Sequence, residues 1–97
     1  MSRAFVKEDD GHEPEPSYAL PDPDAPGYDA AAAWALLEGA NRGDSRSAER
    51  ATGYAWGEPA LVPHIRAILL SAEKDGEDRL AQLARRFLAA AGEPPPP

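Results

Sequence analysis

Residues 58–92 read EPALVPHIRAILLSAEKDGEDRLAQLARRFLAAAG, the longest run of apolar residues at helical spacing in the chain. In the first half of this run the apolar residues recur at intervals of three and four, which places them on one face of a helix. They are Leu61, Ile65, Ile68, Leu69 and Ala72. The second half keeps the same phase with Leu80, Leu83, Ala84, Phe87, Leu88 and Ala91. The spacing predicts two amphipathic helices, over residues 59–76 and 77–91.

A short turn separates the two predicted helices. Gly76 follows Asp75 and is free to take the left-handed conformation that ends a helix, and the acidic pair after it suits a helix N-terminus. The two helices therefore form a predicted hairpin. Pro63 cannot donate to the carbonyl four residues back, so the first helix begins either tightly around Pro59 or at Pro63.

Two further helices are predicted before this hairpin. Residues 28–41 are rich in alanine, with Asp29 as the expected N-cap. Their expected buried face holds Ala30, Ala33, Trp34 and Leu37. A weaker helix, capped by Asp44 or Ser45, is expected to run to about Thr52, with Ala48 and Ala51 as a thin apolar face. Residues 53–57 then form a predicted turn that folds the rings of Tyr54 and Trp56 back onto the helices.

A weak internal repeat accompanies this pattern. A shift of 33 residues superposes Leu36-Leu37 on Leu69-Leu70 and Gly43 on Gly76. It also aligns Arg46 with Arg79, Ala48 with Ala81, Ala51 with Ala84, and Tyr54 with Phe87. Stacked helical hairpins show such a period, and chance similarity between alanine-rich segments gives one too.

The predicted fold is all-α, a small bundle of three to four short helices arranged as helical hairpins over residues 28–92. Residues 1–27 form a predicted disordered, acidic, proline-rich arm, because their composition cannot bury enough apolar surface to offset the entropy of ordering. Within the arm, residues 18–21 are expected to serve either as solvated linker or as an extended segment that adds to a groove. Residues 93–97 form a proline tail.

The net charge of −7 is concentrated in the arm. Residues 1–29 carry two basic residues against eight acidic ones, whereas residues 59–97 carry five of each. Nucleic-acid binders normally show the opposite sign, so we expect no direct DNA or RNA binding. The chain has no cysteine and no apolar run long enough to span a bilayer, and we expect a cytoplasmic protein that does not bind membranes.

The sequence offers little for catalysis. His12 lies among acidic residues in the predicted arm, and His64 sits near a helix start, and neither belongs to a recognisable catalytic or metal-binding constellation. We therefore predict that the protein is not an enzyme and has neither a cofactor nor a metal site. The basic residues Arg66, Lys74, Arg79, Arg85 and Arg86 give the hairpin a basic outer face, which is either a solvated surface paired with nearby acids or a site for a phosphate or an acidic partner.

Two segments resemble the Gre transcript-cleavage factors, which enter the secondary channel of bacterial RNA polymerase. One is SRAFVKEDD at residues 2–10, similar to the start of many such proteins. The other is Gly43-Asp44, followed by the Ala48-Glu49 pair and by YAWG at residues 54–57, similar to the tip and return helix of the family's coiled coil. The resemblance implies docking on RNA polymerase, with Asp44 at the place of a tip aspartate that holds magnesium. The glutamate expected soon after it is Ser47 or is missing, so cleavage is not implied.

Residues 58–63, EPALVP, with the apolar helix after them, resemble the turn and first helix of HEAT-type repeats. That resemblance implies a helical-hairpin module that binds another protein or dimerises. From these patterns we expect a small non-catalytic accessory protein that docks on a larger assembly, plausibly bacterial RNA polymerase, with a protein-binding or dimerising hairpin module as the alternative. The expected partner-binding residues are Arg3, Phe5, Val6, Lys7, Asp44, Tyr54, Trp56, Arg79 and Arg86.

Overall fold

The computed structural model describes residues 18–93. They form the helices α1 (Tyr28–Asn41), α2 (Ser45–Thr52), α3 (Val62–Asp75) and α4 (Asp78–Ala90), with a short 3-10 helix η1 (Pro59–Leu61) before α3. These residues contain no strand, so the prediction of an all-α bundle of short helices is confirmed. The predictions for residues 1–17 and for most of the proline tail lie outside the described residues.

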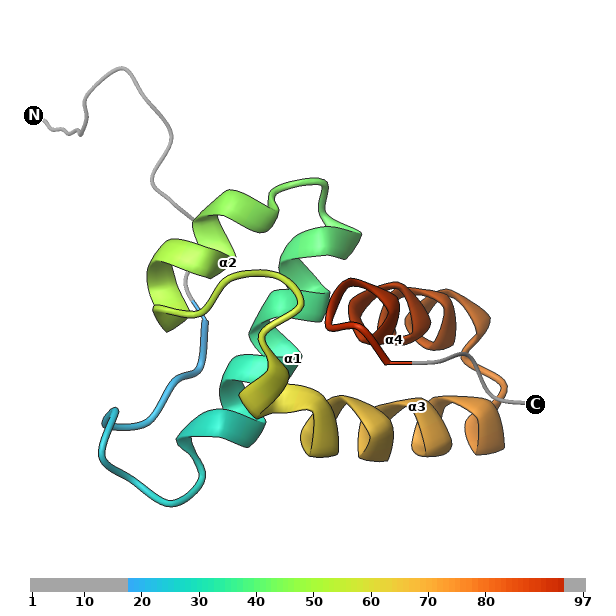
Figure 1. Ribbon diagram of the computed structural model, residues 1–97, viewed down its shortest axis with the longest axis horizontal. Helices are drawn as coiled ribbons and strands as arrows, with labels where there is room; N and C mark the ends of the chain where they lie inside the picture. The colour runs from blue at the N-terminus through green and yellow to red at the C-terminus, as the bar shows by residue number, and fades with distance from the viewer. Residues whose placement is uncertain (1–17, 94–97) are drawn as a thin grey trace, which may run out of the picture.

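Helix α1 is the centre of the bundle. It lies between α2 on one side and the α3–α4 pair on the other (Figure 1). Because it has neighbours on several sides, six of its 14 residues are buried: Ala32, Ala33, Ala35, Leu36, Leu37 and Gly39. The exposed stripe of the helix is Trp34, Glu38 and Asn41, spaced at i, i+4 and i+7.

The predicted hairpin of α3 and α4 is confirmed. Helix α3 ends at Asp75, and Gly76 follows in the left-handed region with φ of 73°. All five apolar residues predicted for the first face are buried, as are Leu83, Ala84 and Phe87 of the second, whereas Leu80 and Leu88 are partly buried. Each of the two starts left open has a counterpart in the structure: Pro59 begins the 3-10 helix η1, and the α-helix itself begins at Val62, one residue before Pro63.

Helix α2 packs against α1 through small residues. An added Cβ on Gly39 would lie 2.6 Å from the Ala48 Cβ, so only glycine permits this approach. Ala48 is fully buried, but Ala51, predicted for the same face, is exposed. The Asp44 side chain caps α2, as predicted, by accepting a hydrogen bond from the Ser47 backbone N–H at 3.3 Å.

Two predictions about α1 are wrong. Asp29 is not the N-cap, because the cap position lies two residues earlier, at Gly27, and Asp29 is already inside the helix. The Asp29 carboxylate instead accepts a hydrogen bond from the Tyr54 hydroxyl at 2.7 Å. Trp34 is not on the buried face, since half of it is exposed (50%). Helix α1 is apolar nearly all round, so its spacing does not single out one buried face.

The packed unit begins earlier than the predicted boundary at Tyr28. Tyr18 and Leu20, which the sequence assigned to the arm, pack against the core. The centre of the Tyr18 ring lies 5.5 Å from the guanidinium carbon of Arg42, the residue that caps the end of α1. The chain from residue 18 is therefore anchored alongside α1 before it enters the helix.

Candidate functional site

A groove of about 570 Å³ opens between α1 and the first turns of α4. We call it the Trp34 groove. Its lining residues are Trp34, Leu37, Glu38, Asn41, Glu77, Asp78, Arg79, Leu80 and Leu83. All three residues of the exposed α1 stripe belong to it, so this stripe forms one wall and α4 the other.

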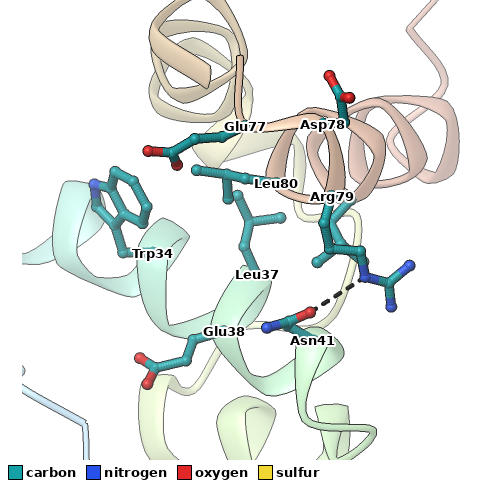
Figure 2. Close-up of a pocket in the computed structure, with 9 residues that line it drawn as sticks. Trp34, Leu37, Glu38, Asn41, Glu77, Asp78, Arg79 and Leu80 are labelled. Atoms are coloured by element: carbon teal, nitrogen blue, oxygen red, sulfur yellow. Dashed lines mark hydrogen bonds between the residues drawn. The ribbon is translucent and has the colours of Figure 1, made fainter. Parts of the chain in front are cut away.

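The floor of the Trp34 groove is apolar. Leu37 and Leu83 are buried, and Leu80 is half-buried between the two helices. Figure 2 shows the Leu80 side chain reaching toward Leu37, with the Trp34 indole standing beside them. A large aromatic ring thus forms a half-exposed wall over a floor of leucine side chains, a surface that suits an incoming apolar side chain.

The rim of the groove carries more negative than positive charge. Three carboxylates, from Glu38, Glu77 and Asp78, stand against the guanidinium of Arg79. Figure 2 shows the Glu77 carboxylate beside Trp34 and the Asp78 carboxylate pointing away from it. Glu38 also pairs with Arg42, which follows the last residue of α1. This imbalance favours ligands that carry positive charge.

Arg79 is held in place by neutral partners. Its Nε donates to the Asn41 Oδ1 at 3.2 Å, the contact drawn in Figure 2, and its Nη1 donates to the Gln82 Oε1 at 3.1 Å. The bond to Asn41 ties the start of α4 to the end of α1. In Figure 2, Arg79 and Trp34 lie on opposite sides of the leucine floor.

The fold produces this groove where α4 begins. The turn at Gly76 sends the chain back so that α4 starts at Asp78, and its first turns cover Leu37. Trp34 lies three residues earlier on α1, beyond the part of the helix that α4 covers. The same apolar wall is thus buried at Leu37 and half-exposed at Trp34.

The structure separates the predicted partner-binding residues. Arg79 lines the Trp34 groove, whereas Arg86 and Trp56 line a second hollow of about 440 Å³ with Ala40, Ser45 and Leu83. Arg3, Phe5, Val6 and Lys7 lie outside the described residues. Asp44 and Tyr54 serve in the contacts that hold α2 and its following loop.

Those contacts explain the electrostatics of Asp44 and Tyr54. The Ser47 hydroxyl donates to the Asp44 Oδ2 at 2.7 Å, and this bond, with the one from the Ser47 backbone, lowers the pKa of Asp44 from its usual 3.8. Donation of the Tyr54 hydroxyl to Asp29 raises the pKa of Tyr54 above its usual 10.0. Both groups are committed to internal hydrogen bonds.

Trp56 is also engaged within the fold. Its ring packs edge-on against Phe87, with ring centroids 4.9 Å apart, and its backbone N–H donates to the Glu49 Oε2 at 2.8 Å. The predicted return of this ring onto the helices is confirmed. Glu49, like Asp44, therefore supports a loop.

The basic face of the hairpin is exposed and partly paired. Arg66 pairs with Glu93, and Arg85 pairs with Glu73 across the α3–α4 hairpin at 2.7 Å. These pairs favour the interpretation of a solvated surface balanced by nearby acids, at least for these two arginines.

Sequence reasoning missed Trp34 and Glu77 as site residues. A signal was present: Trp34 shares an i, i+4, i+7 stripe with the polar Glu38 and Asn41, so a large aromatic ring falls on the polar side of the helix. Whether this stripe is covered depends on where α4 begins and how it packs on α1. That packing is a property of the tertiary structure.

Over residues 18–93 we find no group of three or more histidine, cysteine, aspartate or glutamate side chains placed to hold a metal ion. None of the helices in this range is both long and apolar enough to cross a membrane. Comparison with known protein families, curated proteins and solved structures finds no match to this chain. The Gre and HEAT resemblances therefore stay predictions.

Proposed function

We propose that this protein is a small, non-catalytic, cytoplasmic accessory protein that docks on a larger assembly through the Trp34 groove. The observation that supports this most is the half-exposed Trp34 beside the apolar floor of Leu37 and Leu80. Tryptophan in a partly desolvated pocket is the residue type that most often dominates protein interfaces.

Trp34 can supply one hot spot of a larger interface. Covering the exposed half of a tryptophan removes on the order of 100 Å² from water, worth about 2–3 kcal/mol at the usual coefficient for apolar area. That gain is of the size of an interface hot spot. A groove of about 570 Å³ accommodates one or two bulky side chains of a partner.

RNA polymerase is the assembly we propose, on the strength of residues 2–10 and the turn at Gly43-Asp44. The role of Asp44 as a helix cap, with both carboxylate oxygens bonded to Ser47, supports docking rather than metal binding at this turn. Recovery of polymerase subunits with the chain tests this version. Their absence, alongside recovery of another partner, would contradict it and leave the docking groove in place.

A second candidate function is dimerisation as a helical-hairpin module. It is favoured by Leu70, which is 68% exposed on the outer face of α3. The residue that matches Leu70 in the sequence repeat is the buried Leu37. Sedimentation equilibrium distinguishes the two candidates. A dimer that Leu70→Glu dissociates supports this function, and a monomer at high concentration contradicts it.

The docking function is tested by photo-crosslinking in the native host. Benzoylphenylalanine is placed at Trp34 in one variant and at the exposed Ala67 of α3 in a control variant. The expected result is one defined protein partner captured from position 34 and none from position 67. Capture from position 67 alone, or equal capture from both, would contradict docking through the groove.

A further inference from the structure

We propose that in the free protein the Trp34 groove is occupied by the chain's own residues 3–7, Arg-Ala-Phe-Val-Lys. This proposal rests on the proposed function, because it names the segment that a partner must displace from the same groove. Phe5 and Val6 enter the groove beside Trp34, and Arg3 and Lys7 meet its acidic rim.

The chemistry of the two surfaces is complementary. The groove offers an aromatic wall and a leucine floor, with the Glu77 carboxylate beside Trp34 (Figure 2). Glu38, which pairs with Arg42, and Asp78, which points away from Trp34, add negative charge further out on the rim. Residues 3–7 offer a phenylalanine and a valine between two cations. An aromatic ring packs favourably against another at centroid separations of about 4.5–7 Å, and a cation gains from a nearby carboxylate.

Other segments outside residues 18–93 lack this combination. Residues 8–17 carry five acids and no lysine or arginine, so an acidic rim repels them. Residues 94–97 are four prolines without charge. Arg3 and Lys7 are also the only lysine or arginine residues that precede Arg42 in the sequence.

The tether is long enough. Tyr18 is anchored under Arg42, which directly follows the helix that carries the groove residues Glu38 and Asn41. The eleven steps from Tyr18 back to Lys7 span up to roughly 36 Å when extended. A helix with its side chains is about 10–12 Å wide, so the path around α1 is roughly half of that reach. A tethered segment has an effective concentration on the order of millimolar, which raises its occupancy without a tight contact.

The segment also defines the partner that competes for the groove. A partner gains by offering the same pattern, one or two bulky apolar side chains flanked by lysine or arginine. Docking through Trp34 then becomes an exchange of one cationic apolar segment for another.

The test uses the full chain with Trp56→Phe, which leaves Trp34 as the single tryptophan. Acrylamide quenching of Trp34 is compared with that of a second chain that also carries Phe5→Ser and Val6→Ser. We expect quenching to rise about twofold or more when these two side chains are removed. His12→Ser in the same background is the matched control and leaves quenching unchanged. A synthetic peptide of residues 2–8, added to the Phe5→Ser, Val6→Ser chain, restores protection in a saturable manner.

Two further measurements vary the protein concentration and reverse the charges of Arg3 and Lys7. Protection of Trp34 that is independent of protein concentration supports docking within one chain, and protection lost on dilution would overturn it in favour of a second copy. Arg3→Glu with Lys7→Glu should raise quenching as well. Equal quenching with and without Phe5 and Val6 overturns the proposal, and the proposed function still stands if position 34 captures a partner.

Discussion

The two helix pairs of this protein share one plan and are held together differently. In each, a 14-residue helix ends before a glycine in the left-handed conformation, Gly43 with φ of 78° and Gly76 with φ of 73°, and a second helix begins two residues later. The shift of 33 residues found in the sequence carries α1–α2 onto α3–α4. The α3–α4 pair closes on large apolar side chains, among them the fully buried Phe87.

The α1–α2 pair closes instead on small residues and hydrogen bonds. Gly39 meets Ala48, and the Tyr28 hydroxyl donates to the Thr52 carbonyl oxygen at 2.7 Å. Positions that match in the sequence repeat are therefore buried or exposed according to the helices packed around them. Leu37 is 1% exposed because α4 covers it, whereas its counterpart Leu70 is 68% exposed on a side of α3 that no other described helix covers.

We expect the largest loss of stability from truncating Phe87 in the α3–α4 pair. Phe87→Ala should lower the free energy of unfolding by about 3–5 kcal/mol, because it opens a cavity in the core where Phe87 meets the Trp56 ring. Its counterpart in the repeat, Tyr54→Ala, should cost less, since Tyr54 is only half-buried. Urea unfolding followed by circular dichroism measures both. An equal loss for the two variants would contradict the difference between the pairs.

The two leucines that match in the repeat, Leu37 and Leu70, should differ in how much each contributes to stability. Leu37→Ala should cost about 2–5 kcal/mol, as expected for a fully buried leucine. Leu70→Ala should change stability by less than about 0.5 kcal/mol, as expected for an exposed position. The same urea titration applies. A clearly larger loss of stability for Leu70→Ala, measured in a dilute monomer, would show that another part of the chain packs against this side of α3.

Gly39→Ala tests the close approach of α2 to α1. In an exposed helix this change stabilises, but here the new Cβ would meet the Ala48 Cβ at 2.6 Å, and overpacking costs about 1–3 kcal/mol. We expect net destabilisation, measured by thermal unfolding. Adding Ala48→Gly should recover part of the loss, as a double-mutant cycle would show. A stabilised Gly39→Ala chain would mean that the two helices are further apart.

The smallest effect concerns the second helix of each pair. Asp44 caps α2 with its side chain, whereas Glu77, at the same place before α4, makes no such bond. Asp44→Ala should therefore lower the urea midpoint at pH 7, and Glu77→Ala should leave it nearly unchanged.

The pH dependence of this pair of variants follows from the sign of the shift. The folded-state pKa of Asp44 lies below 3.8, so its contribution to stability is full above the unfolded value and disappears as the pH falls through the folded value. The native chain and Asp44→Ala should converge in urea midpoint below pH 3.8. A difference that persists unchanged to lower pH would contradict the cap.

Much of the fold was predictable because local rules suffice for it. The buried face of α3 follows from helical spacing. The turn at Gly76 follows from the freedom of glycine to take the left-handed conformation that ends a helix. The site was less predictable. Helix α1 is apolar nearly all round, so the stripe that Trp34 shares with Glu38 and Asn41 was only a weak signal that Trp34 faces outward. Asp29 accepts a hydrogen bond from Tyr54, which lies 25 residues later in a loop, and no local pattern indicates that contact.

The central claim is that Trp34, and not Leu70, the other large apolar residue exposed within residues 18–93, is the docking surface. The measurement that tests it most directly is the affinity of the photo-crosslinked partner for purified chains carrying Trp34→Ala or Leu70→Ala. We expect Trp34→Ala to weaken binding roughly tenfold or more and Leu70→Ala to change it by less than about twofold. Equal affinities, or a larger loss at Leu70, would contradict the claim.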